Sequence, residues 1–421
     1  MNSKIIKLNQ EQMPDFADIA IKAYPGAFIP GSVDRDEIIR KFNKVQTEEP
    51  DINTYGLYRD DKLVGGMRLF DFIMRFADLD MKTGGVGTVA VHLLHKKEQV
   101  CKEMIEFFLR HYKDRGYAMA ALYPFRPDFY KKMGFGYGAK LNQYRIKPGS
   151  FPCHGSKEHI EFLKEDDMTE MLLCHDRYRL KTHGLMRKTA NDSSVMFAPD
   201  NFAVGYKKDN IIRGYAIMRF AKSTHDNFMI NDLIIDELVY ESPEVLIDIL
   251  TFLNSQSDQV RDVIYNTHDD NFHYLPGDVR NGAPDLIRIN SHQSNVQGVG
   301  IMYRVIDVKG VFDALKEHNF GGHGTCCTVR FNIHDNFFKE NSKDVTVQFD
   351  NGKAQVIGGT EYDVEVLMDI SDFSSLIIGA VNFQSLYKYG LAKISAFDES
   401  FVGVINQIFA LGQKPMCTSR F

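Results

Sequence analysis

Several features that would point to familiar protein classes are missing from this sequence of 421 residues. Tryptophan is absent, and the six cysteines are scattered without a C-x-x-C pair, which fits reduced thiols in a cytosolic protein. No run of about eighteen apolar residues occurs, the length that a membrane-spanning helix needs. The N-terminal stretch MNSKIIKLNQEQMPDF has no apolar signal core. We therefore expect a soluble, cytoplasmic protein with no membrane partner.

Positive charge is also scarce. The chain carries 50 lysines and arginines against 56 acidic residues, a formal net charge of -6, and it has no basic block. This balance argues against a nucleic-acid partner and leaves cationic ligands plausible. Metal-ligand spacing is missing too, because His268 and His273 in THDDNFHY are not placed as a helical pair and no third ligand is evident. The sequence therefore predicts no metal site.

What the chain does have is enough length for two or three domains. In its first region, EQMPDFADIAIKAY has helical apolar spacing, and TYGLYRDDKLVGGMRLFDFIM reads as a hairpin with Asp60-Asp61 at the turn. GGVGTVAV reads as a short strand, and HLLHKKEQVCKEMIEFFLRHYKDRG as a helix that Gly116 stops. YAMAALYPF is a further strand, and Pro127 opens a short helix. Alternating strands and helices indicate an α/β unit.

This unit is repeated along the chain. YRDDKLVGG starts at Tyr58 and YKKDNIIRG starts at Tyr206, an offset of 206 − 58 = 148 residues, and each continues into a strand. The same offset places Val89-Ala90-Val91 opposite Glu237-Leu238-Val239, and the helical stretch SPEVLIDILTFLNSQ follows there. A hairpin, a strand and a helix in one register are unlikely to recur by accident. We therefore expect two copies of one α/β unit in the first 290 or so residues.

The last region has a different pattern. From GVGIMYRVIDVKGVFDAL onward it alternates short strands, CTVRFNIHD, KDVTVQFDNGKAQVIGG and YDVEVLMDI, with Asp350-Asn351-Gly352 as a hairpin turn. Helical segments follow, ISDFSSLIIGAV, NFQSLYKYG and ESFVGVINQIFAL. Strands followed by helices predict a separate α+β domain.

The stretch RPDFYKKMGFGYG, from Arg126 to Gly138, closes the first unit with the pattern Y-x-x-x-G-F. With the order of elements before it, the unit resembles the GNAT N-acetyltransferases. The resemblance implies that a strand like TVAV binds the pantetheine arm of acetyl-CoA and that the next helix receives the pyrophosphate at its N-terminus. It also implies that Tyr130 is the general acid for the departing thiolate. From the residues alone, Tyr130 can equally be a core aromatic.

The full layout resembles a narrower group, the enhanced intracellular survival (Eis) acetyltransferases. They have two fused GNAT regions, the second degenerate, and a C-terminal domain like the sterol carrier proteins. The implied fold class is α/β with an α+β end: a catalytic GNAT domain over residues 1–150, a degenerate one over 151–300, and a sterol-carrier-protein-like domain over 301–421. The chain of these enzymes ends in a phenylalanine whose α-carboxylate reaches the active site, and Phe421 ends this sequence.

The resemblance therefore assigns roles to particular residues. Tyr130 would be the acid, and the carboxylate of Phe421 would be the base, directly or through water; the alternative for Phe421 is a frayed chain end. Acetyl-CoA would be the co-substrate, with no metal. The implied cofactor-binding residues are Val89, Ala90, Val91, Lys96, Lys97, Glu98, Gln99, Val100, Cys101, Lys102, Phe125 and Arg126.

One segment departs from the family pattern. The pyrophosphate loop of these enzymes is roughly R-R-x-G-x-G/A, whereas here it reads HKKEQVC from His95 to Cys101, with no glycine. Side chains at those positions would crowd the phosphates, and Glu98 would add a repelling charge. His95, Lys96 and Lys97 would still supply cationic contacts.

The function that follows is acetyl transfer from acetyl-CoA to an amine within a ternary complex. The resemblance implies a polyamine or aminoglycoside-like acceptor, either an amine-bearing small molecule or a protein amine, and a homo-oligomer, in this family a hexamer. Carboxylates such as Asp71, on the strand after the hairpin, could pair with its ammonium groups. The alternative is a non-catalytic small-molecule or lipid-binding protein descended from a GNAT enzyme, and the glycine-free loop favours it.

Overall fold

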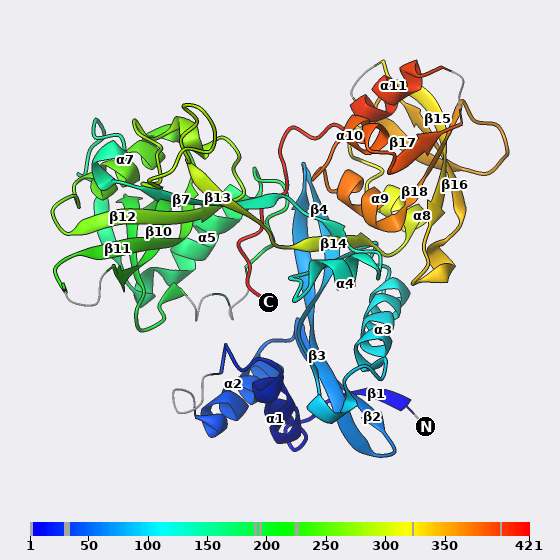
Figure 1. The fold of residues 1–421 in the computed structure, drawn as a ribbon, viewed down its shortest axis with the longest axis horizontal. Coiled ribbons are helices and arrows are strands. Elements are labelled where there is room, and N and C mark those ends of the chain that lie inside the picture. The colour runs from blue at the N-terminus through cyan, green and yellow to red at the C-terminus, as the bar shows by residue number, and fades with distance from the viewer. Residues whose placement is uncertain are drawn as a thin grey trace. The chain divides into compact units, whose positions relative to one another are not determined.

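A computed structural model describes residues 3–28, 34–188, 192, 196–223, 227–321, 324–395 and 398–421 (Figure 1). The chain folds into two compact units. The first contains residues 1–138, 301–412 and Phe421, and the second contains residues 139–300 and 413–420. Among the described residues, no helix is both long and apolar enough to cross a membrane.

The first unit is built on a seven-stranded sheet with the strand order β1-β2-β3-β4-β5-β14-β6. Its elements are β1 (Ser3–Lys7), α1 (Met13–Ala23), α2 (Arg35–Glu48), β2 (Ile52–Arg59), β3 (Lys62–Phe76), β4 (Leu79–Val91), η1 (Leu93–His95), α3 (Val100–Asp114), β5 (Met119–Leu122), α4 (Pro127–Lys131), β6 (Gly136–Tyr137) and β14 (Met302–Val305).

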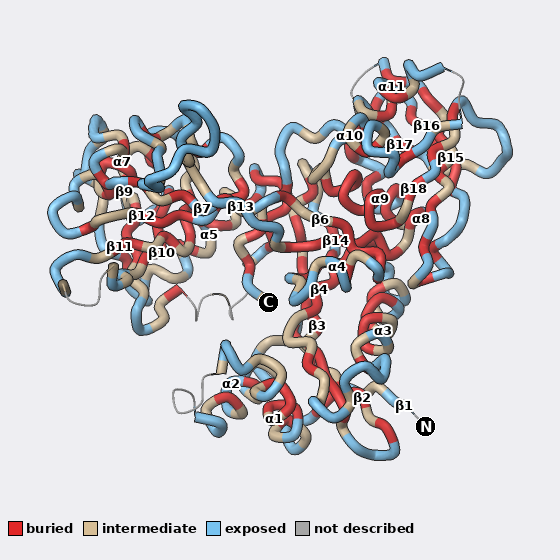
Figure 2. The backbone as a smooth tube through the Cα atoms, viewed as in Figure 1, coloured by how far each residue is buried: buried red, intermediate tan, exposed pale blue. Residues whose placement is uncertain are grey.

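Local sequence explains the core of this sheet. Asp60 and Asp61 both have positive φ, 47° and 62°, so the β2–β3 hairpin turns as expected for a two-residue loop. In α3 the buried residues recur at helical spacing, with Val100, Met104 and Phe108 against the sheet. Helices α1 and α2 cover the opposite face (Figure 1), and buried residues line both contacts (Figure 2).

The second unit repeats this architecture with the strand order β13-β7-β12-β11-β10-β9-β8. Asp209 and Asn210 have positive φ, 52° and 60°, and form the same turn as the first hairpin. The predicted duplication is therefore confirmed. The elements are β7 (Lys140–Ile146), η2 (Pro148–Ser150), β8 (Ile160–Leu163), η3 (Glu165–Asp167), α5 (Met168–Arg179), β9 (Phe202–Lys208), β10 (Ile211–Lys222), β11 (Asn231–Tyr240), α7 (Pro243–Asn254), β12 (Val260–Thr267), η4 (Phe272–Tyr274) and β13 (Asn295–Val299).

The two sheets are completed by strands that follow the other copy in the chain. β7 comes after the first copy but pairs with β12 and β13 in the second sheet. β14 comes after the second copy but lies between β5 and β6 in the first sheet. β14 therefore completes the sheet of the first unit, although the whole of residues 139–300 lies before it in the chain.

The C-terminal region adds a five-stranded sheet with the order β17-β16-β15-β18-β19 to the first unit. Its interior is filled by a cluster of phenylalanine rings, among them Phe312, Phe331, Phe349 and Phe373. The elements are α8 (Val308–Ala314), β15 (Cys326–His334), η5 (Lys339–Asn341), β16 (Asp344–Asp350), β17 (Lys353–Ile357), β18 (Val364–Asp369), α9 (Ile370–Ile377), α10 (Phe383–Lys388), β19 (Ala392–Ile394) and α11 (Ser400–Ile408).

A buried ion pair fastens this region to the first sheet. Arg304 on β14 is fully buried and donates from Nη2 to Asp335 (2.5 Å) and from Nη1 to the carbonyl of Met133 (2.6 Å). Gly134 has φ +81°. The guanidinium group of Arg304 occupies the space that a Cβ at position 134 would need. The glycine that follows Tyr130 in the sequence pattern is thus required by packing as well as by the turn.

Removing the carboxylate of this pair should destabilise the first unit strongly. In Asp335→Ala, Arg304 is left buried without its counter-ion, which typically costs about 3–5 kcal/mol of unfolding free energy. Urea unfolding of the full chain would measure the loss. The matched control is Asp313→Ala, because Asp313 pairs with Lys309 on an exposed helix surface and should cost less than about 1 kcal/mol. Similar losses in the two variants would contradict the role given to Arg304.

Candidate active site

The candidate site is centred on the part of β4 that has no partner on β5. The two strands pair in parallel only from Thr83 with Met119 to Val86 with Leu122. Beyond Val86, β4 continues through the predicted pantetheine-binding residues 89–91 without β5. Thr88 has φ +48° at the register shift between β3 and β4, so a bulge lies at this point. The separation opens the sheet where a ligand arm could pair with backbone groups.

Tyr130 lies at the end of α4, buried within the core cluster on the α3 side of the sheet. Burial raises the pKa of its hydroxyl well above the usual value, and the neighbouring Cys101 and Tyr24 add to the effect. The phenol therefore keeps its proton at neutral pH. Its hydroxyl is hydrogen-bonded to the Cys101 thiol at the start of α3. Tyr130 is thus both packed as a core aromatic and able to act as a proton donor.

Burial also changes the acidity of two groups beside Tyr130, the Cys101 thiol and the Tyr24 hydroxyl. Burial raises the pKa of the Cys101 thiol to about 11, although the hydrogen bond from Tyr130 opposes the shift. Tyr24 donates a hydrogen bond from its hydroxyl to the carbonyl of Val89 (2.8 Å), and burial raises its pKa to about 12.

Two residues of the loop before α3 have left-handed backbone conformations. Lys97 and Gln99 have φ +68° and +67°, the left-handed region that glycine adopts readily. No side chain caps the N-terminus of α3 at Gln99, so the first backbone N–H groups of the helix are available to an anion.

The charges of this loop are arranged to favour an anion. The Glu98 carboxylate accepts hydrogen bonds from Arg59 (3.2 Å) and lies 2.9 Å from Nδ1 of His95. Arg59 also donates to the carbonyl of Glu98 (2.8 Å). The repelling charge expected from Glu98 is therefore compensated. Lys96, Lys97 and Lys102 are exposed at the same end of the helix.

The remaining predicted cofactor residues lie between β5 and α4. Phe125 is largely exposed, at 79%. Arg126 is exposed and forms a two-point contact with Asp128, so its guanidinium is already engaged by a carboxylate. These two residues lie in the segment that leads to Tyr130, but they are not buried with it.

Phe421, the last residue of the sequence, lies on the α1–α2 face of β3 and β4. Its ring packs against Phe70, Phe72 and Tyr123, with ring centroids 4.8–5.5 Å apart. Its terminal carbon lies 2.5 Å from the point where a Cβ on Gly87 would stand. Only a glycine at position 87 therefore admits the chain end at this distance.

Tyr130 and Phe421 lie near the same short segment of β4, on opposite faces of the sheet. Phe421 lies on Gly87, and Tyr24, which neighbours Tyr130, holds Val89. Two residues of strand span roughly 7 Å. The two predicted catalytic residues therefore lie one on each face of the section of β4 that has separated from β5.

The residues before Phe421 belong to the second unit and are held there by several contacts. The backbone N–H of Met416 donates to the carbonyl of His183 (2.8 Å), and Arg420 pairs with Asp236 (2.7 Å). Pro415, Cys417 and Ser419 are buried. The tail is therefore fixed up to its last residues rather than frayed.

Asp71 is not available to an ammonium group. It forms a two-point contact with Arg115, at 2.8 and 2.5 Å, and accepts a hydrogen bond from Tyr112 (2.9 Å). The suggestion that Asp71 binds the acceptor is therefore wrong, because its charge is already neutralised by a structural arginine.

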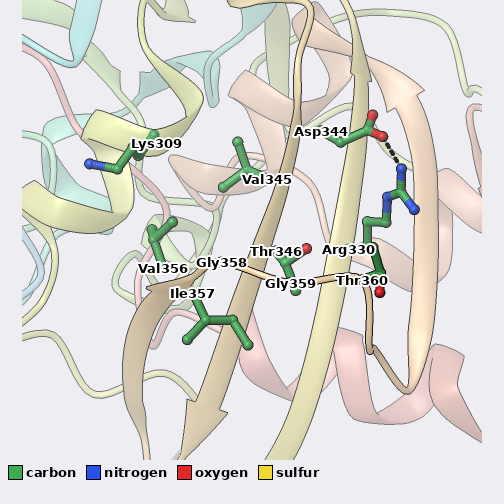
Figure 3. A pocket seen from close by; sticks show the side chains of 10 residues that line it. All are labelled: Lys309, Arg330, Asp344, Val345, Thr346, Val356, Ile357, Gly358, Gly359 and Thr360. Atoms are coloured by element: carbon green, nitrogen blue, oxygen red, sulfur yellow. Dashed lines mark hydrogen bonds and ion pairs between the residues drawn. The ribbon is translucent and has the colours of Figure 1, made fainter.

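A cavity of about 300 Å³ lies elsewhere in the first unit, on the C-terminal sheet (Figure 3). Lys309 and an Arg330–Asp344 ion pair stand at its rim, beside Val345 and Ile357. It shares no residue with the site around Tyr130. Within the described ranges, no cluster of metal-ligating side chains occurs.

Sequence reasoning missed three residues that shape the site. Tyr24 closes the first helical region, Gly87 is one of three glycines in GGVG, and Arg59 precedes a hairpin turn. The pattern of GGVGTVAV predicts a strand but does not show what lies against its glycines. The signal that could have identified Gly87 is its neighbourhood, since three glycines in a sheet interior indicate close approach of another chain segment.

The comparisons with known proteins divide the chain into three parts. Residues 4–138 and 177–304 match families described as acetyltransferase (GNAT) domains, and residues 311–418 match the sterol carrier protein domain. No curated protein matches the chain by sequence.

Solved structures share the whole fold. A GCN5-related N-acetyltransferase from Anabaena variabilis has a TM-score of 0.81 at 17% identity, and a probable N-acyltransferase from Enterococcus faecalis has 0.79 at 19%. Eis1 from Mycobacterium abscessus has 0.73 at 14%. All three alignments cover 100% of both chains. The predicted Eis-like arrangement and fold class are confirmed.

A methyl group at position 87 should displace the chain end. In Gly87→Ala the new Cβ would stand 2.5 Å from the terminal carbon of Phe421, closer than atoms tolerate. We expect a loss of acetyl transfer of about a hundredfold, with CoA binding retained, measured by steady-state kinetics and calorimetry. The control is Gly26→Ala, where a Cβ meets nothing within 4 Å. Parent activity in Gly87→Ala would show that the position of Phe421 is immaterial.

Proposed function

Because the chain belongs to the GNAT acetyltransferases, with two GNAT domains and a sterol carrier protein domain in the Eis-like arrangement, we propose that its first domain transfers an acetyl group from acetyl-CoA to an amine. The observation that supports this most is that Tyr130 and Phe421 lie on the two faces of the unpaired section of β4. A proton donor and a chain-end carboxylate there match the two proton transfers of the reaction.

In this mechanism the chain's own groups bind, orient and move protons. Acetyl-CoA, when bound, supplies the activated acyl group. The α-carboxylate of Phe421 takes the proton of the amine, directly or through water, as the C–N bond forms. Tyr130 gives its proton to the sulfur as the C–S bond breaks. Most of the acceleration comes from holding the two reactants together.

The cofactor residues would divide between two features. The backbone of β4 around Val89 would pair with the pantetheine arm. The N-terminus of α3 and the preceding loop, with Lys96, Lys97 and Lys102 nearby, would take the pyrophosphate. The left-handed residues Lys97 and Gln99 support this proposal, because they keep the loop open without glycine.

The second domain is proposed to be catalytically empty. Glu237 stands at the position of Val89 in the repeat and is buried, with Lys188 3.1 Å and the hydroxyl of Tyr215 3.0 Å away. The corresponding stretch of the second copy, YNTHDDNFHYLPGD, also has no Y-x-x-x-G-F pattern like the one that contains Tyr130. We therefore propose one CoA per chain.

The acceptor is an amine, and the resemblance makes a polyamine or aminoglycoside-like compound the first candidate. The homo-oligomer and the cytoplasmic location stay predictions, as do the domain limits near residues 150 and 300. The alternative is a non-catalytic small-molecule or lipid-binding protein derived from a GNAT enzyme; phenylalanine rings occupy much of the interior of the C-terminal region.

The proposed acid is tested by Tyr130→Phe. The ring keeps its packing, so CoA should bind as in the parent, while turnover should fall about a hundredfold or more. Calorimetry with CoA and steady-state acetyl transfer measure the two quantities. Tyr137→Phe, in the same sequence stretch, is the matched control and should keep the parent rate. If Tyr130→Phe turned over at the parent rate, Tyr130 would be a core aromatic only.

A further inference from the structure

An arginine on the face that holds Phe421 lacks a counter-ion. Arg68 lies on β3, and its guanidinium stacks 4.3 Å from the ring of Phe42 on α2. Two of its nitrogens, Nε and Nη2, are buried and have no hydrogen-bond partner. Among the described residues, no carboxylate lies within ion-pair distance of Arg68.

This arrangement is unusual within the same domain. Arg59 and Arg115 each meet a carboxylate within 2.6 Å. Burial lowers the pKa of Arg68 to about 10, which still leaves it charged at neutral pH. A buried cation without an anion is unfavourable, and stacking on one ring offsets only part of the desolvation.

Arg68 stands on β3 directly opposite the residue of β4 that lies under the proposed base. Arg68 is paired across the sheet with Gly87, the residue under the terminal carbon of Phe421. Side chains directly opposite on antiparallel strands point to the same face, with Cβ atoms about 4.5–5.5 Å apart. Phe70, two residues along β3, touches the Phe421 ring on this face.

We infer that Arg68 binds an anionic group, a carboxylate or a phosphate, carried by the acceptor amine. This inference rests on the proposed acetyl transfer. The acceptor would bind with its amine toward the Phe421 carboxylate and its anion toward the guanidinium, which satisfies both charges. Arg68 is then a specificity-determining residue, and a zwitterionic acceptor replaces a purely cationic one as the preferred substrate class.

Matched acceptors test this with the unmodified chain. 6-Aminohexanoate and 6-aminohexan-1-ol differ in the carboxylate, and O-phosphoethanolamine and ethanolamine differ in the phosphate. We expect the KM of the anionic member to be lower by about tenfold or more in at least one pair. The pair that shows the difference identifies the anion. Equal KM values within both pairs would overturn the inference.

Variants locate the effect at Arg68. Arg68→Gln should raise the KM of the anionic acceptor about tenfold or more, leave its kcat nearly unchanged, and leave the neutral acceptor unaffected. Arg68→Lys should recover part of the affinity because it keeps the charge. Arg40→Gln is the control, since Arg40 is exposed on α2.

The outcomes separate this inference from the proposed function. If no amine were acetylated by the parent chain, the proposed function would fail. If amines were acetylated but Arg68→Gln changed anionic and neutral acceptors alike, Arg68 would be only a structural partner of Phe42. If Arg68→Gln failed to fold, the comparison of acceptors in the parent chain would still decide.

Discussion

The site depends on the separation of β4 from β5 after Val86. Up to that residue the strands share a parallel ladder, and beyond it the backbone of β4 has no partner on that side. Unpaired strand groups are unfavourable unless something satisfies them. Here the hydroxyl of Tyr24 donates a hydrogen bond to the carbonyl of Val89, and the terminal residue Phe421 packs against Gly87. The separation of β4 from β5 thus interrupts the sheet at the place where the candidate catalytic residues lie.

Most of the charged side chains named around this opening have a partner of opposite charge or a hydrogen-bond acceptor, and one does not. Asp71, Glu98, Arg59 and Arg304 all have partners and serve the fold. Arg68 has none among the described residues, and the proposed base, the carboxylate of Phe421, lies across the strand pair from it. Arg68 contacts the ring of Phe42, and we propose that it also binds the anionic group of an acceptor.

Much of the fold could be predicted from the sequence because it is local. The hairpin turns at Asp60-Asp61 and Asn351-Gly352, the stop at Gly116 and the start at Pro127 all depend on neighbouring residues. The repeat was visible because the turn and strand pattern recur together. The exchange of β7 and β14 was not, because strand partners more than a hundred residues apart leave no local signal.

The candidate site was predictable only in part. Tyr130 and Phe421 followed from a resemblance, whereas Tyr24 and Arg68 depend on tertiary packing. Asp71 was misjudged because its pairing with Arg115 joins distant elements. The loop before α3 has no glycine, yet Lys97 and Gln99 in it have positive φ. Residue identity alone could not show that.

The central claim is that the α-carboxylate of Phe421 accepts the proton of the amine. It is tested most directly by adding a single alanine after Phe421, which turns that carboxylate into an amide and moves the charge about 3.8 Å along the chain. The same alanine at the N-terminus is the control. The account predicts that the C-terminal addition abolishes acetyl transfer while CoA binding and the thermal midpoint stay unchanged. Parent activity in the C-terminally extended chain would contradict it.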